Sequence, residues 1–250
     1  KIGPLFRSEK IIHSNIKKVF PEIKLYDLTK ITCFMWNNYG RLFAEYVFMK
    51  NYRNGNLSSK ISIDGLEILD EIKKNNKQVI FISGHFSNFE LMAMQIEKAG
   101  ISLAAIYRPL NNMYLNPIME RIRKKYICKN QIKKGIGGIK KLIKFKKNNY
   151  STALMIDQRV SEGILSNFFN QKALTTTIPA QLVKKFNIPV VPVFIKRIKG
   201  IEFKMTIKKP IFFSKDKSIK TITDELNNVL EQLIIENPEE WIWSHNRWKQ

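Results

Sequence analysis

Residues 79–90 read VIFISGHFSNFE, and this stretch decides the fold of the chain. Its first four residues are a continuous apolar run, which predicts a buried strand, and Gly84 predicts a tight turn after it. The next segment, LMAMQI at 91–96, is amphipathic and predicts a helix over 88–99. His85 is therefore expected at the carboxyl end of a strand, where open α/β sheets usually carry their chemistry.

His85 and Glu90 form an H-x4-E motif in this stretch and are the candidate catalytic residues. We expect Glu90, in the first helical turn, to reach back to the imidazole. A carboxylate there would fix the tautomer and stabilise the imidazolium as the ring accepts a proton, which makes a general base. The same residues also fit a capping box, with Ser87 as the N-cap and Glu90 at N3. Spacing alone leaves both interpretations open.

The rest of the chain alternates between apolar runs and amphipathic segments. Strands are predicted at 60–63, 79–83, 103–107, 152–156, 190–194 and 203–207, and helices at 65–74, 88–99, 114–126, 136–146, 174–187 and 222–235. This order predicts an α/β fold with a mostly parallel central sheet flanked by helices, in a single domain over 1–250.

Residues 1–58 are predicted to be a helical N-terminal segment. Within it, 27–52 carries apolar residues at helical spacing. A helix that packs on the core is the favoured interpretation. A helix lying partly in a membrane interface is the alternative, because aromatic and basic residues are mixed along it.

Composition limits the class of protein. The chain has 250 residues, 44% of them hydrophobic, which is enough for one substantial core. The net charge of +22 favours an anionic partner: nucleic acid, an anionic membrane surface or an acidic protein. Two cysteines and three scattered histidines predict neither a disulfide framework nor a metal site. No apolar run reaches the roughly 18 residues that span a bilayer.

Polar side chains also stand at other predicted strand ends. Arg108 precedes a proline, which favours an extended exit, and its planar guanidinium suits phosphate. Asp157 ends another apolar run and is expected to join His85 and Glu90 at one sheet edge. Thr176 opens a predicted helix and offers a hydroxyl. A surface arginine, a loop cap and an N-cap are the respective structural alternatives.

Five further blocks follow in order: YRPLNN at 107–112, KGIGG at 134–138, DQR at 157–159, ALTTT at 173–177 and WIWSHNRW at 241–248. Together with the H-x4-E motif they resemble the bacterial lipid A late acyltransferases over nearly the whole chain. The resemblance implies a glycerolphosphate-acyltransferase-like fold with His85 and Glu90 catalytic. The residues it assigns to substrate binding are Arg108, Asn111, Arg123, Asp157 and Thr176.

The resemblance also implies a reaction. A fatty acyl chain would move from acyl carrier protein to a hydroxyl of a lipid A precursor in lipopolysaccharide biosynthesis, without metal or cofactor. The implied location is the cytoplasmic face of the inner membrane, and we expect a hydrophobic anchor to precede this sequence. The alternatives are another glycolipid or lysophospholipid acceptor, or a basic membrane-binding or nucleic-acid-binding module. We expect an anionic membrane surface as partner, and no nucleic acid. The tryptophans of 241–248 are expected to pack on the core and contact the interface.

Overall fold

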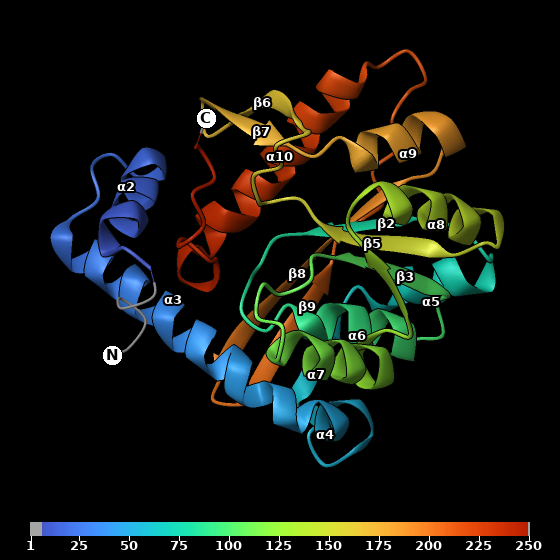
Figure 1. Cartoon of the computed structure of the whole chain (residues 1–250), viewed down its shortest axis with the longest axis horizontal. Helices are drawn as coiled ribbons and strands as arrows, with labels where there is room; N and C mark the ends of the chain where they lie inside the picture. The colour runs from blue at the N-terminus through green and yellow to red at the C-terminus, as the bar shows by residue number, and fades with distance from the viewer. Residues whose placement is uncertain (1–6, 250) are drawn as a thin grey trace.

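The computed structural model describes residues 7–249, which build a seven-stranded sheet between two layers of helices (Figure 1). In spatial order the strands are β1 (Ile61–Asp64), β9 (Glu202–Ile207), β8 (Val190–Lys199), β2 (Ile80–Ser83), β5 (Ser151–Met155), β3 (Leu103–Tyr107) and β4 (Asn130–Lys133). Strands β8 to β4 are mutually parallel, β9 is antiparallel to β8, and β1 is parallel to β9. The predicted α/β fold with a mostly parallel sheet is confirmed. The single-domain organisation stays a prediction.

Each face of the sheet has its own apolar core. One face is covered by α8 (Ile136–Lys147), α9 (Ile178–Phe186) and α10 (Ile219–Glu236). The other is covered by α4 (Met49–Asn54), α5 (Leu66–Lys74), α6 (Glu90–Lys98) and α7 (Leu115–Ile122), which continues as a π-helical turn, η3 (Arg123–Ile127). In β2, Ile82 contributes to the first core and Phe81 to the second. Burial on both faces explains why this strand reads as a continuous apolar run.

The helical N-terminal segment runs along one side of the sheet, from the left to the lower edge of Figure 1. It consists of α2 (Glu9–Val19), α3 (Leu25–Glu45), the 3-10 turn η1 (Tyr46–Phe48) and α4, followed by the 3-10 turn η2 (Ser58–Lys60). One face of α3 is buried through Leu28, Met35 and Leu42. Its opposite face is exposed, so the core-packing interpretation holds for one face only.

Three strands were not predicted from the sequence. The edge strand β4 is short and partly polar. Strands β6 (Ile164–Phe168) and β7 (Gln171–Thr175) form an antiparallel hairpin whose β6 strand packs on α10. Its turn residues, Phe169 and Asn170, both have positive φ (52° and 57°). Phenylalanine is rare in such a turn, so the usual hairpin signal is missing. The predicted helix 174–187 begins only at Ile178 because Thr175 belongs to β7.

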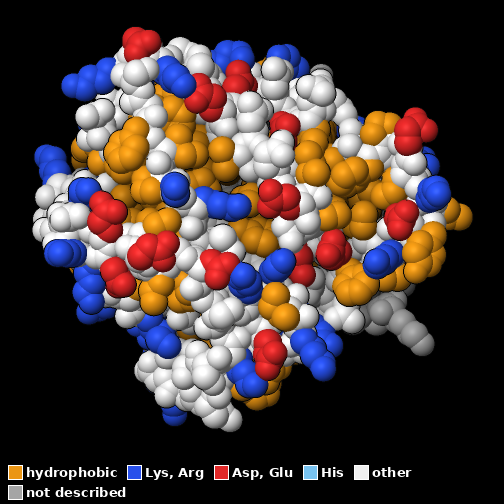
Figure 2. Space-filling model, turned by 180° about the vertical axis from the view of Figure 1, so that it is seen from behind, with side chains coloured by type: hydrophobic (Ala, Val, Ile, Leu, Met, Phe, Trp, Pro, Cys, Tyr) orange, Lys and Arg blue, Asp and Glu red, His pale blue; other side chains and the backbone are white. Residues whose placement is uncertain are grey.

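No helix among residues 7–249 is long and apolar enough to cross a bilayer. Viewed from behind, the surface mixes hydrophobic, basic and acidic side chains (Figure 2).

Candidate active site

A tight turn after β2 carries His85. Gly84 permits this turn, because a Cβ there would lie 2.9 Å from the Phe86 ring and 3.3 Å from the Cβ of Asp157. Only glycine allows the two segments to approach this closely. Ser87 then adopts φ 45°, a left-handed conformation that is unusual for serine. The turn delays the start of α6 to Glu90 and directs His85 towards β5.

Asp157, just beyond β5, holds the imidazole. Strands β2 and β5 are parallel neighbours, so their carboxyl ends meet at one edge of the sheet. Asp157 Oδ1 lies 2.8 Å from His85 Nδ1, while its Oδ2 accepts the His85 backbone N–H at 2.8 Å and the Trp241 indole N–H at 2.9 Å. An ionised carboxylate can only accept, so Nδ1 carries the proton and donates it. The basic lone pair is therefore on Nε2.

The charge of Asp157 is stabilised in a buried position. Its side chain is only 3% exposed. Burial raises the pKa of Asp157, but the charge and hydrogen bonds of His85 and the Trp241 N–H outweigh it and lower this pKa to about 2. The carboxylate is thus ionised at neutral pH and able to stabilise an imidazolium.

The other side of the imidazole is accessible. The His85 side chain is 19% exposed and meets the Phe89 ring edge-on at 4.7 Å between centroids. Among the described residues, none forms a hydrogen bond with Nε2 of His85. This nitrogen can therefore accept a proton from a bound hydroxyl.

Glu90 makes neither of the contacts expected of it. Its Oε1 accepts hydrogen bonds from Nε (2.9 Å) and Nη2 (2.5 Å) of Arg123 and from the hydroxyl of Tyr46. The expected pairing of Glu90 with the imidazole is wrong, because Asp157 occupies that position. The capping box is also absent, since the Ser87 hydroxyl accepts no backbone N–H of the first turn and α6 begins three residues later. Glu90 instead anchors a buried arginine.

Arg123 stands at the start of η3, 8% exposed, with its guanidinium 5.6 Å from the centre of the Tyr107 ring. Burial lowers the pKa of Arg123, but the charge of Glu90 and its hydrogen bonds to the guanidinium outweigh burial, so this pKa lies above the usual value. Its Nη1 is buried and has no hydrogen-bond partner among residues 7–249. Burial, and then the charge of Glu90, raise the pKa of Tyr46, which stays a neutral donor.

The C-terminal segment (residues 240–248) closes this edge of the sheet. The Ser87 N–H donates to the Glu240 carbonyl at 2.9 Å, and the Ile242 N–H donates to the His85 carbonyl at 3.2 Å. His245 Nε2 accepts the backbone N–H of Arg159 at 3.0 Å. The segment thus fastens both the His85 turn and the loop that carries Asp157. The sequence carried no signal for this arrangement.

The tryptophans of the C-terminal segment are core residues. Trp241, Trp243 and Trp248 are 1%, 0% and 6% exposed. Trp248 donates its indole N–H to the Phe168 carbonyl at 3.1 Å. Their packing on the core is confirmed, and burial leaves them little surface for a membrane interface.

Among the described contacts, the remaining predicted site residues form no hydrogen bond or ion pair with His85 or Asp157. Arg108 and Asn111 are exposed in the loop after β3. Thr176 is buried, and its Oγ1 accepts the Ile178 N–H at 3.4 Å in the first turn of α9. Substrate binding by these three residues stays a prediction. Among the described residues, no cluster of histidine, cysteine and acidic side chains could hold a metal ion.

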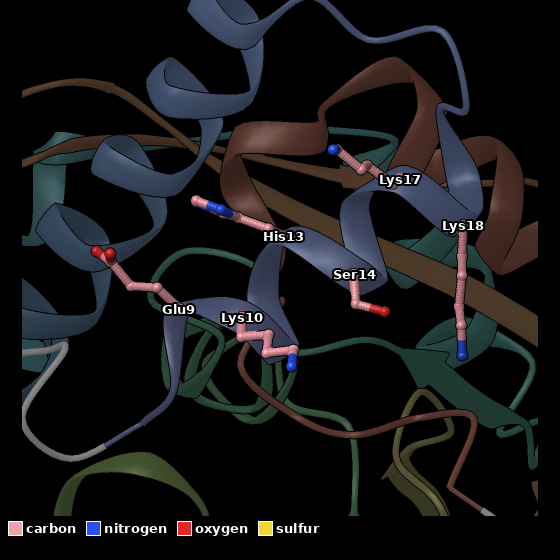
Figure 3. A pocket seen from close by; sticks show the side chains of 6 residues that line it. All are labelled: Glu9, Lys10, His13, Ser14, Lys17 and Lys18. Carbon is pink, nitrogen blue, oxygen red and sulfur yellow. The ribbon is translucent and has the colours of Figure 1, made fainter.

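A surface hollow on α2 contains none of these residues. It is lined by Glu9, Lys10, His13, Ser14, Lys17 and Lys18. In Figure 3 all six side chains project from this one helix, with the lysine ammonium groups spread around it. The opposite face of α2 is buried, and there Asn15 donates to the Trp243 and His245 carbonyls at 2.8 and 2.9 Å. The hollow is therefore a basic surface on a helix that packs against the C-terminal segment (residues 240–248).

At this sheet edge a buried carboxylate is hydrogen-bonded to a partly exposed histidine. Such a pair is typical of proteins that activate a hydroxyl by removing its proton. The chain belongs to the bacterial lipid A biosynthesis acyltransferase family, whose model matches residues 2–250. The resemblance inferred from the motifs is thereby confirmed.

Curated relatives are similar at low identity. The chain is 27% identical to lipid A biosynthesis acyltransferase 2 of Shigella flexneri over 72% of its own length, and it spans 58% of that relative. It is 24% identical to the lipid A biosynthesis lauroyltransferase of Escherichia coli K12, covering 97% of this chain and 79% of the relative. Among solved structures, the 1-acyl-sn-glycerophosphate acyltransferase of Thermotoga maritima aligns with a TM-score of 0.44 and 12% identity, over 85% of this chain and 97% of that one.

Proposed function

We propose that this chain is an acyltransferase that moves a fatty acyl group from an acyl carrier protein thioester to a hydroxyl of a lipid A precursor. One observation carries the chemistry: Asp157 orients His85 through Nδ1 while the imidazole stays partly exposed. Family membership supplies the reaction class. The net charge of +22 supports acidic partners, namely the carrier protein, the acceptor phosphates and the anionic cytoplasmic face of the inner membrane.

In the proposed reaction, His85 Nε2 takes the proton of the acceptor hydroxyl as its oxygen attacks the thioester carbonyl. Asp157 stabilises the imidazolium that results. The tetrahedral intermediate then expels the thiolate, the C–S bond breaks, and the imidazolium returns its proton to the sulfur. Transfer is direct, without an acyl-enzyme intermediate. Neither cysteine contacts His85: Cys128 is buried with its Sγ against the Leu103 carbonyl, and Cys33 is exposed.

Glu90 acts through Arg123 in this proposal. The Glu90 carboxylate holds two nitrogens of the guanidinium and leaves Nη1 as a charged donor without a partner. Such a donor suits an oxyanion or a phosphate oxygen. Exposed Arg108, at the end of the neighbouring strand β3, is assigned to an acceptor phosphate.

The basic hollow on α2 is assigned to the acidic carrier protein. Lys10 and Lys17 are exposed there, and α2 packs on the segment that closes the site. Lys10→Glu with Lys17→Glu should raise the KM for a carrier-bound donor and leave the KM for a small-molecule thioester unchanged. Equal effects on both donors would remove this assignment.

The test of the function is a mass measurement. Purified protein is incubated with acyl carrier protein donors and a tetraacyl lipid A precursor, in parallel with a mannosylated glycolipid and a lysophospholipid as alternative acceptors. We expect a gain of one acyl mass on the lipid A precursor alone. His85→Ala should keep the circular dichroism of the parent and lose about 100-fold or more of the rate. Acylation of a different acceptor, or full activity of a folded His85→Ala variant, would overturn the proposal.

A further inference from the structure

The outer face of α3 is apolar although it meets solvent. Six large hydrophobic side chains of α3 and η1 are between 45% and 77% exposed: Leu25, Tyr26, Phe34, Phe43, Val47 and Phe48. Helical spacing spreads them over the solvent-facing half of the helix, away from buried Leu28, Met35 and Leu42, with Tyr26 near the middle of that half and Phe34 and Phe43 on its two opposite flanks.

The charges on this face are mostly positive. Within 24–50, all of which the structure describes, the exposed bases are Lys24, Lys30, Arg41 and Lys50. Asp27 is the one exposed acid in that range. Large apolar side chains interspersed with bases over the exposed half of one helix suit a helix lying in the interface of an anionic bilayer.

The inner face of the same helix holds the His85 turn. Glu45 accepts the side-chain N–H of Asn88 at 2.7 Å and is fixed by Arg197 at 2.6 Å. The next residue, Tyr46, donates its hydroxyl to Glu90. The outer face of α3 is therefore tied through two adjacent side chains to both ends of the segment that follows His85.

We propose that the outer face of α3, defined by the six exposed residues above, docks the protein on an anionic lipid surface and holds the His85 turn towards that surface. The inference rests on the proposed function in one respect: an acceptor that is itself a lipid lies in such a surface. The loop after β3 adds exposed Met113 and Tyr114, 74% and 80% exposed, beyond a strand end of the same edge.

Charge and composition favour lipid over a protein occupant. A second copy would bring the same basic face and the same net charge of +22, which repel each other. An acidic protein would pair with the bases and leave six large apolar side chains uncovered. An anionic bilayer satisfies both groups, with headgroups for the bases and acyl chains for the apolar residues.

The experiment measures vesicle binding of the whole chain, without catalysis. Vesicles contain either phosphatidylcholine alone or phosphatidylcholine with phosphatidylglycerol. The test variant is Tyr26→Asp with Phe34→Asp, both remote from the turn. The matched control is Phe212→Asp, because Phe212 is 76% exposed and lies next to the bridge between Ile211 and Val190, at the amino end of the strands.

We expect wild type to bind the phosphatidylglycerol vesicles, the double variant to bind at least about tenfold more weakly, and the control to stay within about twofold. With acceptor dispersed in detergent micelles, the double variant should keep the wild-type rate. Unchanged vesicle binding by the double variant would overturn the inference.

Two other outcomes identify a different occupant and also overturn it. If the double variant abolishes self-association in sedimentation without changing vesicle binding, the face meets a second copy. If it slows transfer from the carrier protein in micelles instead, the face meets the donor. Failure of wild type to transfer any acyl group in micelles would remove the proposed function and leave the vesicle result standing.

Discussion

Replacing Asp157 by asparagine tests which carboxylate orients the imidazole. In wild type, Oδ2 accepts two N–H groups, from the His85 backbone at 2.8 Å and from Trp241 at 2.9 Å, while Oδ1 accepts one from the ring. An asparagine has a single oxygen for these two positions. Its orientation therefore decides which nitrogen of His85 carries the proton.

The two orientations differ clearly in free energy. If the amide NH2 faced the backbone and indole donors, two buried N–H groups would lose their acceptor, at about 1–3 kcal/mol each. The oxygen therefore stays with those donors, and the NH2 group donates to Nδ1. This favours the tautomer with the proton on Nε2, which cannot act as the base. A preference of about 2 kcal/mol leaves roughly 3% of the competent tautomer.

We expect Asp157→Asn to lose at least about 30-fold in rate from the tautomer alone, approaching the 10²–10⁴ that a general base typically contributes. Its melting temperature should stay near that of wild type, because the oxygen keeps its two donors. Single-turnover acyl transfer followed by mass spectrometry measures the rate, and nitrogen NMR of His85 reports the tautomer. The exposed acid Asp64 gives the control, Asp64→Asn. A rate within about threefold of wild type would refute the role of Asp157.

Three further outcomes follow from the same contacts. Glu90→Gln should lower the melting temperature by on the order of 10 °C, because removing one partner of a buried ion pair costs about 3–5 kcal/mol and leaves the charge of Arg123 uncompensated. The double variant Glu90→Gln with Arg123→Met should regain part of that loss. Trp241→Phe should keep its rate within about tenfold at pH 7 while losing thermal stability, because one N–H bond to a buried carboxylate is worth about 1.5–3 kcal/mol and Asp157 stays ionised. Burial lowers the pKa of His245 from 6.5 to about 4. Between these pH values the unfolded chain binds a proton at His245 that the folded chain does not, so stability falls as the pH falls. Thermal melts from pH 6.5 down to 4 should therefore show wild type losing stability more steeply than His245→Gln.

The sheet was largely predictable because its central strands are buried on both faces and read as apolar runs. The prediction for 103–107 coincides with β3, and that for 79–83 is one residue longer than β2. Strand β4 was missed because its residues, Asn130–Lys133, lie at the sheet edge and carry polar side chains. Local patterns report burial, so an edge strand gives a weaker signal than a central one.

The candidate site was predictable in its location and not in its pairing. His85 and Asp157 were both placed at strand carboxyl ends, which the structure bears out. Sequence spacing suggested Glu90 as the partner, and the position of Asp157 at a strand end placed it only at the same edge of the sheet. The actual partner depends on β2 lying beside β5, a tertiary fact. Nothing in the sequence connects Tyr46 to Glu90, because the two residues lie 44 positions apart.

The position of the C-terminal segment (residues 240–248) in the chain sets the order in which parts of the structure can form during synthesis. Residues 240–248 leave the ribosome after every strand described above, so a nascent chain can assemble its sheet before Trp241 reaches Asp157 and before Ile242 fastens the His85 turn. During that interval the histidine already stands at its strand end, but the loops around it are unsecured. The contacts that organise the candidate site therefore form only after the sheet strands have been synthesised, because Trp241 and Ile242 follow all of them in the chain.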